Sequence, residues 1–255
     1  MLFYIVLFLG TISLWWHWRA RDRMKVTNLT GKYIFITGCD TGFGNMAAKT
    51  FDKKGFRVFA SCLTETGAKE LKAETSNQLQ TVLLDVRDSD SVKKVAAWIK
   101  AEVQSEGLWG LINNAGIMGP SAPTDWRDMK AFGVNVSCIQ PGLFKTPLSS
   151  PVKILKEKEI IWNQLPPRTK KQYGEEYFQK DAAKKEKLTK ICLNEDISLV
   201  VECMEHALTS LYPRTHYIIG QDAKWFWTPL SKMPAAVQDF LLLRNRAKPA
   251  ASHAN

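Results

Sequence analysis

The feature that most constrains the fold is a glycine-rich turn between a buried strand and a helix. Residues 33–49 read YIFITGCDTGFGNMAAK, in which a β-branched and aromatic run meets Gly38, Gly42 and Gly44 before a helix-forming segment begins. Glycines let the backbone turn tightly and approach a pyrophosphate, and the following helix N-terminus supplies free N–H groups and a positive dipole end. The segment therefore predicts a nucleotide-binding half.

Strands and helices alternate through the first half of the chain. The predicted strands are 33–37, 56–62, 79–86 and 108–113. The predicted helices are 45–54, 65–75 and a long helix capped by Asp90, with Val92, Val95, Ala96, Ile99 and Val103 on one face. This alternation predicts a parallel sheet with right-handed crossovers.

Composition narrows the function classes. The 255 residues contain five cysteines with no Cys-x-x-Cys pair, so we expect free thiols and neither a disulfide framework nor a metal site. The net charge is +10, and residues 153–190 hold eleven Lys/Arg against six Asp/Glu. We expect no nucleic-acid partner, because no nucleic-acid motif accompanies this charge. A solvated helical face and attraction to an anionic membrane both remain open.

The N-terminus is strongly apolar. Residues 1–18 carry Trp15, Trp16 and Trp18 at their end, where an interfacial aromatic belt would lie, and a basic linker follows over 19–30. A cleaved signal peptide is the alternative, but no basic region precedes the apolar run and no small-x-small cleavage site follows it. We expect an uncleaved anchor helix that attaches the chain to a membrane.

Four ordered landmarks carry a family resemblance. They are Thr37-Gly38-x-x-x-Gly42-x-Gly44, then Asp85, then Asn113-Asn114-Ala115-Gly116, and finally Pro141-Gly142 with Thr146. Together they resemble the short-chain dehydrogenases/reductases. The N-terminal anchor and the surroundings of the first and third landmarks are similar to the membrane-bound retinol and hydroxysteroid dehydrogenase branch.

The resemblance implies an oxidoreductase that uses NAD (NAD+/NADH) and acts on an apolar alcohol, a retinoid or steroid, at the endoplasmic reticulum membrane. It implies that the loop holds the pyrophosphate, that Asp85 contacts the adenine, that the segment after the fourth strand lines the adenine ribose and that Thr146 lies near the nicotinamide carboxamide. The implied cofactor-binding residues are Gly38, Asp40, Thr41, Gly42, Phe43, Gly44, Asp85, Asn113, Ala115, Gly116 and Thr146.

Structural alternatives stay open for several of these positions. Gly42 and Gly44 could serve only close helix–strand packing, Asp85 could be a turn residue, and Thr146 could be an ordinary loop residue. The choice of NAD over NADP is not read from residues, because Ser61–Thr64 offers no acidic side chain at the end of the second strand. Arg57, inside that strand, is a poor candidate for a 2′-phosphate.

The proton-transfer pair of the family is missing. In that family a Tyr and a Lys four residues later share one helix face, and the Lys charge stabilises the phenolate. None of the six tyrosines of this chain has a Lys four residues on, so we assign no catalytic residue. The family's proton relay cannot form without that pair.

The spacing explains this absence. Only twenty residues, 114–133, separate the fourth strand from the next predicted strand at 134–139. Two crossovers and an intervening strand need roughly 30 residues. We therefore expect an internal deletion joined near 126/127, the simplest origin being a skipped exon. Strands flanking the lost one must pair directly or leave unpaired edges, which predicts lower stability.

The C-terminal part is expected to be mostly helical. Residues 151–193 are predicted helical, 197–211 an amphipathic helix and 215–219 a final strand. The apolar runs 224–227 and 240–243 suit either core packing or a substrate mouth or second membrane contact. His206 and His216 lack any partner pattern of a metal site.

The sequence thus predicts a membrane anchor (1–18), a basic linker (19–30), a dinucleotide-binding domain (31–150) and a helical substrate or membrane-associated region (151–255). The fold class is α/β, a Rossmann-like parallel sheet with flanking helices, truncated by loss of a central strand and parts of two helices. By resemblance the function is that of an NAD-dependent alcohol dehydrogenase with activity absent or impaired in this chain. A non-catalytic nucleotide-binding or interaction protein, or an unstable splice product, is the alternative.

Overall fold

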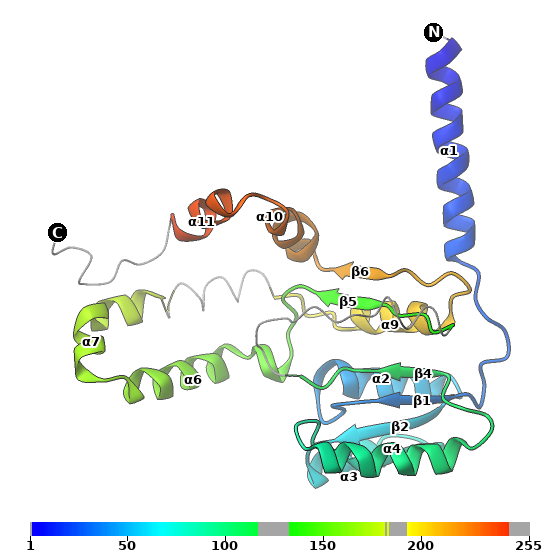
Figure 1. Cartoon of the computed structure of the whole chain (residues 1–255), viewed down its shortest axis with the longest axis horizontal. Coiled ribbons are helices and arrows are strands. Elements are labelled where there is room, and N and C mark those ends of the chain that lie inside the picture. Colours follow the sequence, from blue (N-terminus) through cyan, green and yellow to red (C-terminus); the bar gives the residue numbers. More distant parts are fainter. Residues whose placement is uncertain (1, 117–132, 182, 184–192, 245–255) are drawn as a thin grey trace. The chain divides into compact units, whose positions relative to one another are not determined.

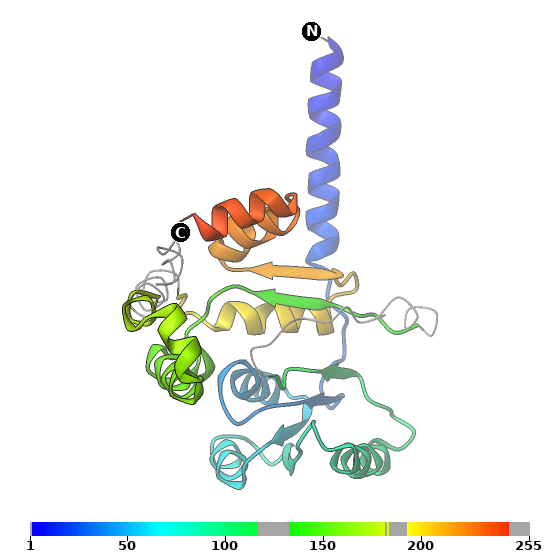
Figure 2. The ribbon, with the colours of Figure 1, turned by 60° about the vertical axis from the view of Figure 1, so that its left-hand side comes forward.

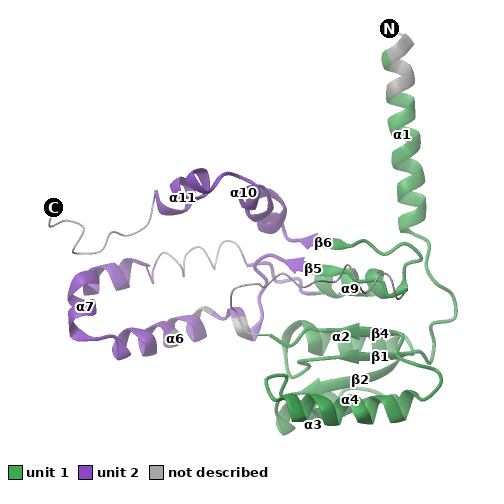
Figure 3. Ribbon diagram, in the orientation of Figure 1, with its two compact units in different colours: residues 1–139, 198–217 green, residues 140–197, 218–255 purple. Residues whose placement is uncertain are grey.

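The computed structural model describes residues 2–116, 133–181, 183 and 193–244 (Figure 1). The expected join near 126/127 lies outside these residues. The chain divides into two compact units, residues 1–139 with 198–217 and residues 140–197 with 218–255 (Figure 3). The glycine-rich loop belongs to the first unit.

A four-stranded parallel sheet forms the centre of the first unit. Its strands are β1 (Tyr33–Ile36), β2 (Arg57–Cys62), β3 (Leu79–Leu83) and β4 (Gly110–Ile112), in the order β3-β2-β1-β4. All three pairings are parallel. The predicted parallel α/β architecture is therefore confirmed for this part of the chain.

Helices cover both faces of this sheet, because alternate residues of each strand point to opposite sides. Helix α4 (Ser89–Val103) lies on one face, and α2 (Gly42–Lys53) and α3 (Glu65–Ala73) lie on the other (Figure 2). On the α4 side, Phe35 and Phe59 pack with three apolar residues of the helix, Val95, Ile99 and Val103. Tyr33 stacks on Phe59 at 5.4 Å between ring centroids, and Trp98 meets the same ring edge-on at 5.0 Å.

Several expected boundaries were wrong in detail. Asp88, and not Asp90, caps α4, and its side chain accepts a hydrogen bond from the Asp90 amide. Val92 of the predicted apolar face is 40% exposed, while the half-buried Trp98 packs against the core. Helix α2 begins at Gly42, three residues before the expected start.

Two further strands pair with each other outside the main sheet. Strand β5 (Cys138–Pro141) was expected at 134–139, and β6 (His216–Ile219) falls within the expected range. They form a separate two-stranded sheet. Among the described strands, β4 pairs with β1 alone, so the main sheet ends at β4. Direct pairing of β4 with β5, which the short connection would have permitted, is not formed.

Helix α9 (Ser198–Thr209) belongs to the first unit and packs against α2. Its Leu208 fills the space next to Gly110, where an added Cβ would lie 2.5 Å from the Leu208 Cδ2 atom. The Trp109 indole Nε1 donates to the Leu208 carbonyl at 3.0 Å. The close approach of α9 therefore explains why a glycine stands at position 110 and what the Trp109 side chain contacts.

The second unit is mainly helical. It contains η1 (Pro147–Ser149), α6 (Pro151–Gln164), α7 (Pro167–Tyr173), η2 (Ala223–Trp227), α10 (Thr228–Ser231) and α11 (Ala235–Leu243). The apolar runs in η2 and α11 are exposed: Trp225 is 78% exposed and Phe240 is 61% exposed. Core packing, one of the two interpretations of these runs, does not account for these two side chains.

The N-terminal helix α1 spans Leu2–Asp22. Five of its aromatic side chains are exposed, Tyr4, Phe8, Trp15, Trp16 and Trp18, with Trp16 at 69%. Within the described residues, no helix combines the length and the apolar character needed to cross a bilayer.

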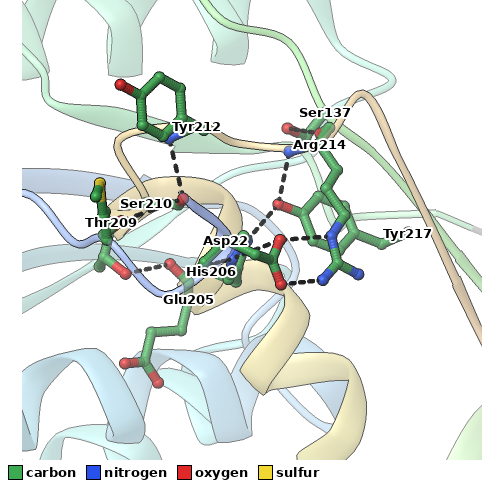
Figure 4. Close-up of polar contacts among 10 residues, drawn as sticks. Asp22, Ser137, Glu205, His206, Thr209, Ser210, Tyr212, Arg214 and Tyr217 are labelled. Carbon is green, nitrogen blue, oxygen red and sulfur yellow. Dashed lines mark hydrogen bonds and ion pairs between the residues drawn. The ribbon is translucent and has the colours of Figure 1, made fainter. Parts of the chain in front are cut away.

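A polar cluster fixes the end of α1 to α9 and β6 (Figure 4). The His206 Nε2 atom lies 2.7 Å from the Asp22 carbonyl, so this nitrogen carries the proton and donates. The other ring nitrogen, Nδ1, lies 2.7 Å from the Tyr217 hydroxyl. Arg214 forms an ion pair with Asp22, and its hydrogen bond holds the Asp22 pKa below the usual range despite partial burial.

We predict that Phe59→Ala destabilises the first unit by about 3–5 kcal/mol, because the ring fills the centre of the core on the α4 side. Urea unfolding followed by Trp fluorescence measures the loss, since Trp98 contacts the replaced ring. Leu83→Ala, on an exposed position of β3, is the matched control and should cost well under 1 kcal/mol. Equal losses for the two variants would contradict this assignment of the core.

Candidate nucleotide-binding site

The glycine-rich loop runs from the end of β1 into the first turn of α2. Gly38 and Gly42 have φ angles of 71° and 68°, in the left-handed region that favours glycine. An added Cβ at Gly44 would lie 2.3 Å from the Gly38 carbonyl oxygen, so this position is closed to any side chain. The loop therefore folds back on itself as a tight cradle at the N-terminus of α2.

The segment after β4 holds this loop in place. The Asn114 side-chain amide donates to the carbonyls of Thr37 at 2.9 Å and Gly38 at 3.0 Å. The Thr37 hydroxyl in turn accepts from the amides of Asn114 and Ala115, both at 3.0 Å. The first and third sequence landmarks therefore meet in space, through Asn114, which was not among the predicted site residues.

The first turn of α2 is suited to an anion. It contains no acidic residue, and its N-cap, Thr41, makes no side-chain capping hydrogen bond. Thr41 is exposed, and Gly42 and Phe43 are half-buried. The N–H groups of a first helical turn and the positive end of the helix dipole favour a negatively charged group at such a position. The residues present therefore fit a dinucleotide pyrophosphate.

The remaining predicted residues of the first unit lie at the same sheet edge as the loop. Asn113 and Gly116 are exposed beside the half-buried Ala115. Asp85 follows β3 and forms an ion pair with Arg87 at 2.6 Å, whose hydrogen bonds lower the Asp85 pKa to about 2. The carboxyl ends of parallel strands β1, β3 and β4 thus carry these groups, the edge where open α/β sheets bind ligands.

Thr146 lies in the second unit. It caps η1: its hydroxyl accepts from the Ser149 amide at 3.4 Å, while the Ser149 hydroxyl accepts from the Thr146 amide at 2.8 Å. A nicotinamide contact for Thr146 stays a prediction.

Two buried thiols lie in the loop and at the end of β2. Cys39 and Cys62 are fully buried, and burial raises the Cys62 pKa to about 12. Burial also raises the pKa of Cys39. Both side chains are therefore neutral packing groups and not nucleophiles.

Comparison with known proteins places this geometry in a family. A profile of the short chain dehydrogenase family matches residues 32–132. Human dehydrogenase/reductase SDR family member 9 is 48% identical over 298 aligned positions, which cover 91% of this chain and 93% of the relative.

The chain belongs to the short-chain dehydrogenase/reductase family.

Other relatives define the branch. Mouse 17-beta-hydroxysteroid dehydrogenase type 6 and mouse retinol dehydrogenase 16 are each 35% identical, over 98% of this chain and 99% of their own lengths. This short-chain dehydrogenase/reductase therefore lies in the retinol and hydroxysteroid dehydrogenase branch. Among solved structures, a 3-ketoacyl-(acyl-carrier-protein) reductase from Brucella melitensis, complexed with NADH, is 30% identical over 35% of this chain and 36% of that chain, with a TM-score of 0.33.

Two tyrosine hydroxyls of the first unit, those of Tyr33 and Tyr217, have partners other than a lysine. The Tyr33 hydroxyl accepts from the Arg57 Nη1 atom at 2.5 Å, at the end of β1 opposite the glycine-rich loop. The buried Tyr217 hydroxyl contacts His206 and accepts from the Arg214 amide at 3.0 Å. Burial raises the Tyr217 pKa, which opposes formation of a phenolate.

We predict that Gly44→Ala abolishes dinucleotide binding, because its methyl group would meet the Gly38 carbonyl and the Asn114 amide at 2.3 and 2.5 Å. Isothermal titration with NADH measures the loss. Gly10→Ala adds the same methyl where nothing lies within 4 Å and should bind as the unmodified chain does. Unchanged affinity in the Gly44 variant would show that this loop does not hold the cofactor.

Proposed function

We propose that this chain binds NAD(H) through the Gly38–Gly44 loop, with alcohol oxidation absent or severely impaired. The observation that supports NAD(H) binding is the folded Gly38–Gly44 loop. Asn114 holds this loop by two hydrogen bonds, and the loop leads into the N-terminus of α2. When bound, the nicotinamide would accept a hydride from the alcohol carbon. The loop amides of this chain would bind the pyrophosphate and orient the dinucleotide along the sheet edge.

Impaired turnover is supported by the sequence. No tyrosine has a lysine four residues later, so no phenolate stabilised by a lysine on the same helix face can take the alcohol proton. General acid–base groups contribute roughly 10²–10⁴-fold to enzymatic rates. Oxidation by this chain should therefore be slower than that of an intact relative by at least that factor.

An internal deletion accounts for this loss. The bovine member 9 relative aligns over 315 positions that cover 97% of this chain and 98% of the relative. Because this chain has 255 residues, at least 60 aligned positions of the relative face a gap in it. The end of the main sheet at β4 is consistent with a missing neighbouring strand. We propose that the gap removed a central strand and parts of two helices.

The substrate class follows from the branch. The relatives are named as retinol and 17-beta-hydroxysteroid dehydrogenases, which supports an apolar alcohol, a retinoid or a steroid, as the ancestral substrate. A non-catalytic nucleotide-binding or interaction protein is the second candidate, favoured by a binding loop retained without the proton-transfer pair.

We predict that the purified chain in detergent binds NADH, yet forms NADH from NAD with all-trans-retinol or a 3α-hydroxysteroid at least about 100-fold more slowly than the human relative. NADH fluorescence measures binding and formation in one cuvette. The Gly44→Ala variant serves as the binding control. Turnover equal to that of the relative would refute impairment, and loss of both signals would indicate a chain that does not fold.

We also propose that α1 attaches the chain to the endoplasmic reticulum membrane. Apolar and aromatic side chains along the helix are exposed, including Leu14 at 71% and Trp16 at 69%, and its last turn carries Arg19 and Arg21. Exposed tryptophans followed by arginines suit the boundary between lipid and water.

We predict that the chain stays with the microsomal pellet after carbonate extraction. Replacing Leu9 and Leu14 together by Asp should release it, because each buried carboxylate costs about 2.5–3.5 kcal/mol in a membrane-inserted helix. The matched control replaces exposed Lys69 and Lys93 by Asp and should remain in the pellet. Carbonate release of the unmodified chain would contradict this attachment.

A further inference from the structure

The Asp40 carboxylate lies at the carboxyl end of β2, although Asp40 belongs to the glycine-rich loop. One oxygen, Oδ2, accepts from the Leu63 amide at 2.7 Å. The other, Oδ1, accepts from the Thr64 amide at 2.9 Å and from the Thr64 hydroxyl at 2.7 Å. A negative charge therefore occupies the turn between β2 and α3, where the sequence itself places no acidic residue.

The surroundings are built to hold this carboxylate. Thr64 is the N-cap of α3, and its hydroxyl also accepts from the Gly67 amide at 3.1 Å. An added Cβ at Gly67 would lie 2.7 Å from Asp40 Oδ1, so any side chain at this position would crowd the carboxylate. The carboxylate thus takes the position at the start of α3 that a bound anion would otherwise occupy.

This position matters for the choice of cofactor. In dinucleotide-binding α/β folds the adenosine ribose lies at the end of the second strand, where an acidic residue binds the 2′-OH and a basic one accommodates a 2′-phosphate. The basic groups nearby in sequence are engaged elsewhere: Lys69 lies 3.6 Å from Glu65, and Arg57 donates to Tyr33 at the opposite end of β2. A 2′-phosphate would therefore meet a negative charge and two amides that already have an acceptor.

We propose that Asp40 is the specificity-determining residue that makes this chain select NAD(H) over NADP(H). Its carboxylate repels a 2′-phosphate and occupies the Leu63 and Thr64 amides that could have bound one. The same oxygens offer acceptors to an unphosphorylated ribose. This inference rests on the proposed nucleotide binding and assigns its selectivity to one side chain.

The charge is present at neutral pH. Burial raises the pKa of Asp40, but the hydrogen bonds from Leu63 and Thr64 outweigh burial and hold it below its usual range. A side chain with a lowered pKa stays ionised throughout the range in which dinucleotides are assayed.

The test compares NADH and NADPH binding by the full chain in detergent, measured by isothermal titration. The unmodified chain should bind NADH more tightly than NADPH. Asp40→Asn keeps the shape and removes the charge, so the NADPH-to-NADH ratio of dissociation constants should fall by at least about tenfold. Glu70→Gln, an exposed α3 position with the same change in charge, is the matched control and should leave the ratio unchanged.

A second variant keeps the proposal testable if Asp40→Asn does not fold. Leu63→Arg places a guanidinium beside the intact carboxylate at a 59% exposed side chain, and should also lower the ratio. Adenosine 2′,5′-bisphosphate serves as a direct probe: it should bind both variants better than the unmodified chain.

The outcomes separate two failures. If the unmodified chain binds neither dinucleotide, the proposed nucleotide binding is wrong, and the selectivity with it. If it binds NADH and Asp40→Asn weakens both dinucleotides by the same factor, Asp40 only supports the turn and the selectivity assignment is wrong.

Discussion

Four hydrogen bonds between Thr37, Gly38, Asn114 and Ala115 are the contacts on which the candidate site depends. They join the end of β1 to the end of β4, the two neighbouring strands whose carboxyl ends form the loop's support. Thr37 is 5% exposed, so these polar groups would carry a desolvation penalty if their partners were lost. The loop can therefore hold a tight, glycine-dependent shape without a ligand, and a dinucleotide would not have to order it.

The same strand forms an edge of the main sheet among the described residues. Strand β4 supports the loop on one side and, among the described strands, pairs with no neighbour on the other. An unpaired parallel edge leaves backbone groups open to water or to another chain. Because Leu111 on this strand is 52% exposed, apolar surface is open there as well. Nucleotide binding, if it occurs, and stability would therefore be linked physically, since both depend on how firmly β4 is held.

Local patterns predicted the elements and missed the contacts between them. Strands β1, β2 and β6 and helices α3 and α9 follow the sequence closely, since hydrophobic patterning and glycine signals act over a few residues. The strand expected at 134–139 begins instead at Cys138, because pairing with β6 sets its limits and Val134, without a partner, stays 43% exposed. Asn114 belongs to the third landmark, but its contacts with the loop were not predicted, because its partners lie 76 and 77 positions earlier in the chain.

The negative charge of Asp40 at the end of β2 could likewise not be predicted from the local sequence. Inspection of Ser61–Thr64 found no acidic residue at the end of β2, and that observation about the sequence is correct. The structure supplies the charge from 24 positions earlier, because the glycine-rich loop turns back over the end of the neighbouring parallel strand. Since the carboxyl ends of parallel strands converge at one edge, side chains from any of their loops can serve the same subsite. The groups that recognise a ligand at such an edge are therefore supplied by several loops together, and they cannot be found by inspecting one loop alone.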